Sequence, residues 1–410
     1  MKESSVTIPL RSFPKTIDPT NMGQVDSFRV GKLLSDGLFA LGKNLEVTNV
    51  VAERVEWSDD QLELNIKIKD IQFSDGTPVS SNDVVRAIER CVRKTEEFGT
   101  ESLKRIVGYK EFIDGKAKTM SGVKEINSKN LSIKLNGLAG LLLNDLADNS
   151  CFLIKEGPGG TLDFLKGAIG VGPYKISSIE DSKEIKIVKR EDFPYENNGP
   201  DVVYFKVADN FGSFDKMKDK FDLIVLDDYV ENIEDFNSYA YSPIGSLQLI
   251  VNCTRAPFND LEVRKALFLA LDGYPFHDKL GWPLDEFQES IIPFGVAGFQ
   301  RREKFGSVNE AEAILRKKGF SENNPLSFQI FISKGTNTDV EAKIWSTVAF
   351  PSKLIQVQAK EVIFGDIWDD FVAKKFDAVR LTRYPGSTEA HKSLSAFLSS
   401  SPFNFSGFKS

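Results

Sequence analysis

The sequence predicts a mixed α/β protein with more than one domain. Segments that alternate apolar and polar residues, as half-buried strands do, recur between segments with apolar residues at helical spacing. Clusters of Gly, Pro, Asn and Asp, which favour turns, separate the two kinds of segment. The 410 residues exceed what one hydrophobic core usually serves, so two or three domains are expected.

The clearest strand and helix follow each other early in the chain. A strand is expected over residues 62–68, where the alternating apolar residues are Leu62, Leu64, Ile66 and Ile68. The turn sequence Ser-Asp-Gly-Thr-Pro at 74–78 ends it. Ser80 and Asp83 then form a predicted capping box. The helix after it has one apolar face, made by Val84, Val85, Ile88, Cys91 and Val92.

Further elements are expected along the rest of the chain. Strands are predicted around 185–187, 203–207 and 247–251, with a strong turn at 197–200 between the first two. A helix is predicted over 261–271, with an apolar stripe of Val263, Ala266, Leu267, Ala270 and Leu271. Asn309 is expected to cap another helix, which Gly319 ends.

Composition and charge argue against several classes of protein. The net charge of -7 and the pI near 5.3 argue against nucleic-acid binding, because a protein that binds phosphates needs clustered Lys and Arg side chains. No apolar stretch has the roughly 18–20 residues of a membrane span. Cys91, Cys151 and Cys253 are too few, and odd in number, for a disulfide framework. The first residues lack the apolar segment of a signal peptide, so the sequence is either cytoplasmic or that of a mature exported chain.

Residues for catalysis or metal binding are sparse. The two histidines, His277 and His391, have no partners at metal-ligand or catalytic-triad spacing. The glycine-rich stretches 157–160 and 167–172 lack the strand, helix and Lys-Ser/Thr context of nucleotide-binding loops. The sequence therefore predicts no enzymatic activity and no cofactor or metal.

Several segments, in order along the chain, resemble motifs of one family. Segment 73–90 is similar to the pattern F-x-D-G-T-P-[LV]-T-A-x-D-V-V-x-[ST]-[IL]-E-R. Segments 170–175, 251–267, 292–295, 311–320 and 404–408 are similar to further motifs of that family. The chain thus resembles extracellular solute-binding protein family 5, the periplasmic proteins that bind oligopeptides, dipeptides or nickel complexes for ABC importers.

The resemblance implies an α/β, two-lobed periplasmic-binding-protein fold (type II, similar to cluster C) with a hinge and an extra inserted subdomain. It places the first lobe at 1–43 and 165–246, the inserted subdomain at 44–164 and the second lobe at 247–410. In the family, a C-terminal segment after the motif at 404–408 returns to the first lobe. Here Ser410 follows that motif closely, so the return segment is expected to be short or missing.

The resemblance also implies a function. A small solute, peptide-like or other, would be captured between the lobes and delivered to the permease subunits of an ABC importer. The protein would be a monomer, exported to the periplasm or the cell surface, and without contact to nucleic acid. One alternative is a ligand-sensing module that serves a regulator or membrane partner without transport, and another is a hydrolase with a closing cleft.

The binding segment departs from the peptide-binding pattern. Peptide-binding members carry W-x-A-D-Y-x-D-P, whose first Asp pairs with the α-ammonium of the ligand. The matching segment 379–386 is anchored by Tyr384, and this puts Arg383 where that Asp would be. An arginine suits a carboxylate or phosphate and not an ammonium. We therefore expect an anionic ligand group at Arg383, with Arg380, Thr382 and Tyr384 beside it. The alternative is an Arg383 that turns to solvent or pairs with a protein carboxylate.

Two further segments usually reach the cleft in this family. One follows residues 17–19, which makes Met22, Gln24 and Phe28 candidate ligand contacts. The other is the strand that crosses between the lobes, which makes Gln248 and Asn252 candidates. For each of these residues, a role in the core or hinge is the alternative.

Overall fold

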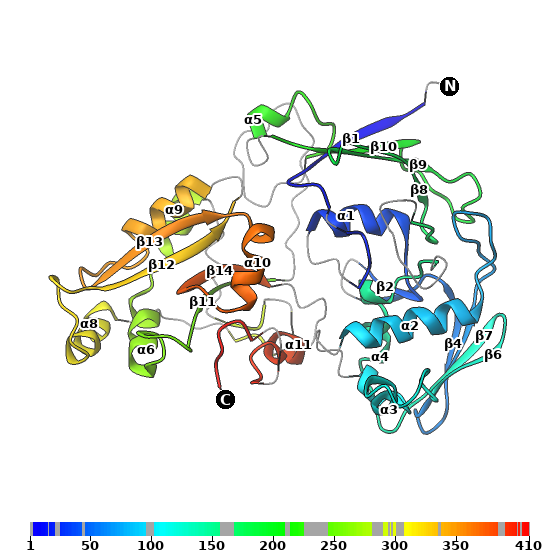
Figure 1. The fold of residues 1–410 in the computed structure, drawn as a ribbon, viewed down its shortest axis with the longest axis horizontal. Helices are drawn as coiled ribbons and strands as arrows, with labels where there is room; N and C mark the ends of the chain where they lie inside the picture. The colour runs from blue at the N-terminus through cyan, green and yellow to red at the C-terminus, as the bar shows by residue number, and fades with distance from the viewer. Residues whose placement is uncertain are drawn as a thin grey trace. The chain divides into compact units, whose positions relative to one another are not determined.

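The computed structural model describes most of the chain and divides it into two compact units. The described residues are 3–14, 16–20, 25–42, 46–95, 102–155, 168–209, 214–224, 245–280, 290–293, 296, 298–300, 307–334, 338–383, 390–399, 401 and 404–409. One unit comprises Met1–Phe211 and Asp215–Ile224, and the other comprises Gly212–Phe214 and Val225–Ser410. Both units mix helices and strands, as the sequence predicts (Figure 1).

The first unit contains a four-stranded sheet built from distant parts of the chain. Its strands, in spatial order, are β1 (Ser5–Leu10), β10 (Val202–Val207), β9 (Glu184–Lys189) and β8 (Tyr174–Glu180). The pair β1–β10 is parallel, and the other two pairs are antiparallel. Helix α1 (Val25–Leu34) packs on this sheet, because its apolar face shares a core with the inward residues of the strands.

A second sheet of the first unit comes from one continuous region. Its strands are β4 (Ala52–Trp57), β5 (Glu63–Ile68), β7 (Asn130–Lys134) and β6 (Val123–Asn127), all antiparallel. Helix α2 (Ser81–Thr95) packs against it (Figure 1), and the predicted apolar stripe of this helix is buried. Shorter elements complete the region: β2 (Phe39–Leu41), β3 (Val47–Asn49), η1 (Leu103–Arg105), α3 (Tyr109–Ile113), α4 (Leu142–Leu146) and η2 (Asn149–Cys151).

The predicted turn and capping box before α2 are confirmed. Gly76 has φ +82°, a left-handed conformation that glycine adopts without strain. The carboxylate of Asp83 accepts hydrogen bonds from the backbone N–H and the hydroxyl of Ser80, at 2.9 and 2.6 Å. The backbone N–H of Asp83 donates to Ser80 Oγ at 3.4 Å, which closes the box. Local polar contacts therefore set the start of α2.

Arg190 connects the two sheets of the first unit. It follows β9, and its fully buried guanidinium donates to the carbonyl oxygens of Gly172, Gln72 and Phe73 at 3.0–3.1 Å. Its Nη2 also lies 2.8 Å from a carboxylate oxygen of Asp192. Gly172 has to be glycine, because an added Cβ would lie 2.5 Å from the carbonyl carbon at the end of α1. The junction thus combines a buried cation with a close backbone contact.

The second unit is built around one mixed sheet. In spatial order, its strands are β11 (Ser246–Val251), β14 (Ala378–Arg383), β12 (Leu326–Ser333) and β13 (Ile355–Val362). Strand β11 is antiparallel to β14, and β12 is parallel to β14 and β13. The last strand of the unit therefore lies in the interior of the sheet, beside the first.

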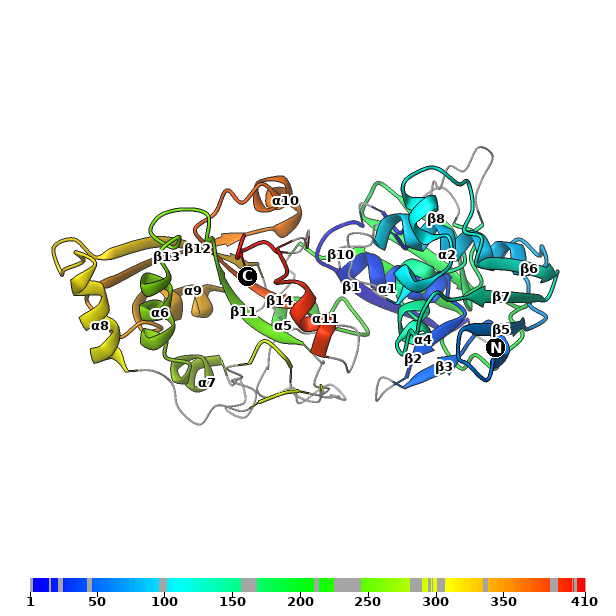
Figure 2. The same ribbon diagram turned by 90° about the horizontal axis from the view of Figure 1, so that it is seen from below.

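Helices cover both faces of this sheet. One face packs against α6 (Leu261–Ala270), α7 (Tyr274–Leu280), α8 (Val308–Lys317) and α9 (Thr338–Thr347). The other face packs against α10 (Phe364–Val372) and Phe405 near the C-terminus. Figure 2 shows α10 on one side of the sheet and α6, α7 and α9 on the other. Two short helices, α5 (Phe214–Met217) and α11 (Ala390–Ser395), complete the described elements.

The start of α8 differs from the prediction. Asn309 was expected to cap this helix, but Ser307 does so, because its side chain accepts a hydrogen bond from the backbone N–H of Glu310. The prediction overlooked a Ser-x-x-Glu pattern two residues earlier in the chain. The helix ends as predicted at Gly319, which has φ +88°.

Two of the sheets draw their strands from segments that the resemblance groups together, whereas the β2–β3 pair spans the expected boundary at 43/44. The β1–β10–β9–β8 sheet uses strands from 1–43 and 165–246, and the β4–β5–β7–β6 sheet lies within 44–164. The predicted boundary at 246/247 lies beside residues 225–244, which are outside the described residues. The domain boundaries therefore stay predictions. No helix in the described part of the chain is long and apolar enough to cross a membrane.

Candidate ligand-binding site

Strand β14 carries the segment in which the sequence predicts ligand contacts. In its antiparallel pairing with β11, Arg383 lies opposite Ser246, and Leu381 lies opposite Gln248. Opposed residues of paired strands point to the same face of a sheet, and alternate residues of one strand share a face. Ser246, Gln248 and Arg383 therefore lie on one face, so the structure brings together two of the predicted residues, Gln248 and Arg383.

Arg383 lies near two aromatic rings at the end of β14. Its guanidinium carbon is 5.5 Å from the ring centre of Phe397 and 5.3 Å from that of Phe405. Burial lowers the pKa of Arg383 to about 10, so the side chain is still a cation at neutral pH. Aromatic faces attract a cation and hold its plane in place. The end of β14 therefore carries a partly desolvated positive charge beside two aromatic rings.

Gln248 adds a polar group on the same face. Its Nε2 donates to Ser246 Oγ at 2.7 Å. Its Oε1 is buried and has no hydrogen-bond partner among the described residues. A buried amide oxygen in that state can accept a hydrogen bond from an N–H or O–H group of a ligand or from a water molecule. Together, Arg383 and Gln248 present a cation and a hydrogen-bond acceptor.

Arg380 points to the opposite face of the sheet. It is opposite Leu249 in the register, and its Nε lies 2.9 Å from Glu341 Oε1 on α9. The same carboxylate oxygen accepts a hydrogen bond from Trp345 Nε1 at 3.0 Å. Both members of the ion pair are mostly buried, with 16% and 6% of their side-chain surface exposed. This geometry argues against Arg380 as a partner of Arg383 for one ligand group.

Asn252 has a structural role in the second unit. It is fully buried, and its Nδ2 donates to the carbonyl oxygens of Lys374 and Phe376 at 2.7 and 3.0 Å. Its Oδ1 accepts from the backbone N–H and the hydroxyl of Thr254 at 3.0 and 2.7 Å. These four hydrogen bonds use both N–H donors and both lone pairs of the side-chain amide. They argue against ligand contact by Asn252 and for the core role that the sequence left open.

The remaining predicted contacts are less well defined. Thr382 is half-buried, lies opposite Leu247 and shares the face of Arg380. Phe28 is half-buried on α1 in the first unit. Met22, Gln24 and Tyr384 lie outside the described residues. Ligand contact by these five residues stays a prediction.

Sequence reasoning missed three residues around Arg383. Ser246 lies one strand period before Gln248 and could have been found from the alternation of β11. Phe397 and Phe405 are separated from β14 in sequence. The spacing rules for strands and helices relate only neighbouring residues, so they do not link these two phenylalanines to Arg383. No pattern in the sequence indicates that their rings contact the guanidinium of Arg383.

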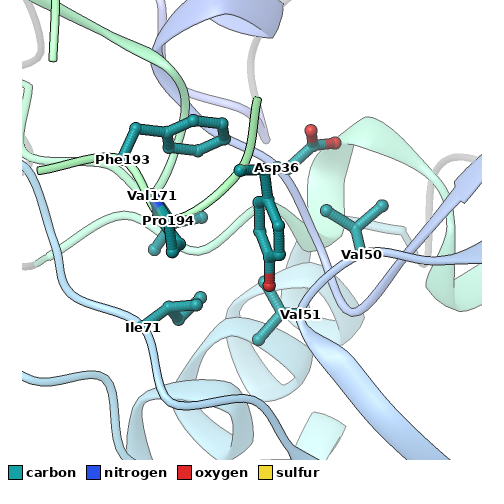
Figure 3. A pocket seen from close by; sticks show the side chains of 8 residues that line it. Asp36, Val50, Val51, Ile71, Val171, Phe193 and Pro194 are labelled. Carbon is teal, nitrogen blue, oxygen red and sulfur yellow. The ribbon is translucent and has the colours of Figure 1, made fainter. Parts of the chain in front are cut away.

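A small cavity lies within the first unit. It is lined by Asp36, Val50, Val51, Ile71, Val171, Phe193, Pro194 and Tyr195, seven of which Figure 3 labels. The volume open to the centre of a water molecule is about 20 Å³, which holds one or two waters and no peptide. None of the predicted ligand contacts lines it. The cavity is therefore a feature of the packing of the first unit and not the candidate site.

Asp36 beside this cavity is expected to make stability depend on pH. Burial raises the pKa of Asp36 to about 6, although Lys32 and the backbone N–H of Gly37 lower it in part. Because the folded pKa lies above the unfolded value of about 3.9, this group destabilises the fold above pH 6, and the cost disappears as the pH falls toward 4. Asp36→Asn is therefore expected to stabilise the protein by up to about 3 kcal/mol at pH 7.5 and to have little effect at pH 4.

Urea unfolding of the wild type and Asp36→Asn at both pH values checks this expectation. Asp59→Asn is the matched control, because Asp59 is exposed and its replacement should change stability by less than about 0.5 kcal/mol. An Asp36→Asn variant with the same stability difference from wild type at pH 4 and pH 7.5 would contradict it.

Groups for metal or acid–base chemistry are not assembled in the described residues. There, no three His, Cys, Asp or Glu side chains lie close enough to hold a metal ion. His277 lies within α7, with its ring centre 6.1 Å from that of Tyr274. His391 lies in α11. His277 is not in the group formed by Arg383, Gln248 and Ser246.

Curated relatives are similar over part of their length. The glutathione-binding protein GsiB of Escherichia coli (strain K12) is 25% identical over 283 residues, which cover 65% of this chain and 52% of the relative. GsiB of Escherichia coli O1:K1 is 26% identical with the same coverage. The match therefore spans about half the length of these relatives.

Solved structures show the same fold. The Escherichia coli murein tripeptide binding protein MppA has a TM-score of 0.81 at 21% identity, covering 100% of this chain and 85% of that chain. Haemophilus influenzae OppA, in complex with the peptide RPPGFSPFR, has a TM-score of 0.80 at 20% identity with the same coverage. NikA from Staphylococcus aureus, in complex with Ni(L-His)2, has a TM-score of 0.79 at 19% identity and covers 99% and 84%. The predicted two-lobed fold of this type is thereby confirmed.

A family model described as bacterial extracellular solute-binding proteins, family 5 Middle, matches residues 46–405. This range contains every strand of the three four-stranded sheets except β1. It also contains the candidate site around β11 and β14. The chain belongs to the bacterial extracellular solute-binding proteins of family 5.

Proposed function

We propose that this chain is the solute-binding protein of an ABC importer and that it binds a small, peptide-like solute through an anionic group. The observation that carries the proposal is the position of Arg383, a partly desolvated cation near two aromatic rings, in a chain of this family. A guanidinium offers two parallel N–H donors, which match the two oxygens of a carboxylate. A terminal carboxylate of a short peptide is the group that suits it best.

Gln248 supports a peptide-like ligand over a simple anion. Its buried Oε1 can accept a hydrogen bond from an amide N–H or an ammonium group, which a peptide carries in addition to its carboxylates. The curated relatives are named for binding glutathione, which is a tripeptide with two carboxylates. We therefore place short anionic peptides first among the candidate ligands.

The proposed mechanism is a shift between conformations, without a chemical step. A ligand that contacts both lobes only when they are closed stabilises the closed state by those additional contacts. The permease subunits would then recognise the closed form. On this proposal the chain performs no catalysis, works as a monomer and acts in the periplasm or at the cell surface, where family 5 proteins meet their ligands.

Isothermal titration calorimetry with matched peptides tests the proposal. The panel contains reduced glutathione, a neutral tripeptide and C-terminal amides of both. Micromolar or tighter binding of at least one peptide with a free carboxylate is expected, with a clear loss on amidation. Mass spectrometry of small molecules released from the denatured protein would identify a ligand that co-purifies. A protein that binds no member of the panel and releases no solute would refute the proposal.

A further inference from the structure

Two of the cysteines meet in the core of the first unit. Cys91 lies on the inner face of α2 and is 0% exposed, and Cys151 ends η2 and is 3% exposed. Helix α2 packs directly on η2, and both cysteines belong to the same hydrophobic core. They are far apart in the sequence, so their count and spacing gave no sign of this contact.

Hydrogen bonds around the two sulfurs show how close the segments are. Cys91 Sγ lies 3.1 Å from the hydroxyl oxygen of Ser150, the residue next to Cys151. The Ser150 hydroxyl donates to the carboxylate of Asp148 at 2.6 Å, so the Cys91 thiol is the donor to Ser150. Cys151 Sγ donates to the carbonyl oxygen of Asp145 at 3.7 Å. Rotation of either side chain about its Cα–Cβ bond breaks only weak hydrogen bonds of this kind.

The thiols also interact with each other. The neighbouring Cys91 side chain raises the pKa of the Cys151 thiol well above its usual range, and burial raises it further. The Cys151 sulfur is therefore a thiol and not a thiolate in the reduced fold. Because the thiolate is the reactive form and both sulfurs are shielded from solvent, the pair cannot exchange readily once the core has closed.

We propose that Cys91 and Cys151 form a disulfide bond between α2 and η2 when the chain folds in an oxidising compartment. In this step, the thiolate of one cysteine attacks a disulfide-containing oxidant, which forms a mixed disulfide and releases one thiolate of the oxidant. The thiolate of the other cysteine then attacks the protein sulfur of the mixed disulfide and displaces the second thiolate of the oxidant. Two S–H bonds are lost and one S–S bond forms. Two electrons pass to the oxidant, which leaves as two thiols.

The burial of the pair sets when this bond forms. Oxidation has to precede the closure of the core, because both sulfurs are shielded from an oxidant afterwards. The disulfide would link α2 covalently to η2, which follows β7 in the chain. It would reduce the conformational entropy of the intervening residues in the unfolded state. Cys253, which is half-buried in the second unit, is left as the single thiol.

Counting thiols after refolding tests the proposal. The full chain is refolded in a mixture of oxidised and reduced glutathione, denatured without reductant, and treated with N-ethylmaleimide before its intact mass is measured. The expected result is one adduct, on Cys253, against three in a sample refolded with dithiothreitol. Three adducts in the oxidised sample, or glutathione attached to both Cys91 and Cys151, would overturn the proposal.

Single variants identify the bonded pair. Cys91→Ala and Cys151→Ala should each show two adducts under oxidising conditions, because each leaves the other partner unbonded. Cys253→Ala should show none. A peptide map of the oxidised wild type should contain the fragment that links residues 91 and 151. This map identifies the bonded pair even if a variant does not fold. A link that includes Cys253 would contradict the assignment.

A stability measurement completes the test. The oxidised wild type is expected to unfold roughly 5–10 °C above the reduced form, as a bond that closes a long loop predicts. Cys253→Ala should keep this difference, and Cys91→Ala should lose it. None of these experiments needs a ligand, so their failure would leave the proposed binding function untouched.

Discussion

Replacement of Arg383 by alanine is expected to weaken binding of an anionic peptide roughly 30- to 1,000-fold, or about 2–4 kcal/mol. The variant loses the charge that faces the ligand carboxylate and leaves that carboxylate desolvated without a partner. The rings of Phe397 and Phe405 stay in place but carry no donor. Calorimetry at pH 7.5, where Arg383 is fully protonated, measures the loss.

Two controls separate binding from folding. Arg383→Lys keeps the charge but loses the paired N–H donors, so an intermediate affinity is expected. Arg380→Met removes an arginine from the same strand whose partner is Glu341 on the opposite face. It should lower stability and leave affinity within about threefold. Equal affinities for the wild type and Arg383→Ala would exclude Arg383 from the site.

Replacement of Arg190 by methionine is expected to destabilise the first unit by about 3–5 kcal/mol. The side chain is fully buried, and its loss removes a donor from three carbonyl oxygens and from the carboxylate of Asp192; of these, Phe73 O keeps the backbone N–H of Gly76. Methionine keeps much of the volume, so the effect comes from polar groups and not from a cavity. Hydrogen exchange of peptides that cover β9 and residues 72–73, followed against urea, reports this loss in the first unit alone.

An exposed lysine supplies the comparison for Arg190. Lys67 pairs with Glu53 at 2.9 Å, but about half of each side chain is exposed, at 49% and 47%. Lys67→Met should therefore lower the free energy of unfolding by less than about 1 kcal/mol. If Arg190→Met shifted the urea midpoint no more than Lys67→Met, the buried contacts of Arg190 would not hold the two sheets together.

Much of the fold could be predicted because its signals are local. The alternation at 62–68, the capping box of Ser80 and Asp83 and the stripe of α2 all depend on residues within one turn or one strand of each other. The family motifs follow from the same local features, since a turn at Gly76 and a tight approach at Gly172 constrain the residue type directly. Among the described helices, the cap of α8 was misplaced by two residues.

The candidate site was less predictable because its contacts join distant segments. The alignment of the Tyr-Pro pair indicated Arg383, and the crossing strand indicated Gln248, but the sequence alone did not show that they share a face. The partner of Arg380 lies on α9, and the partners of Asn252 are backbone carbonyls of residues 374 and 376. Backbone acceptors have no residue type, so a sequence pattern cannot reveal them.

The division of β14 into two faces has a practical consequence for engineering. Arg380 pairs with Glu341 of α9 on one face, whereas Ser246, Gln248 and Arg383 lie together on the opposite face. A combinatorial library that varies only positions 246, 248 and 383 would leave the Glu341 ion pair untouched. Selection from such a library could redirect the protein toward new solutes, as a biosensor scaffold requires, while its fold is retained.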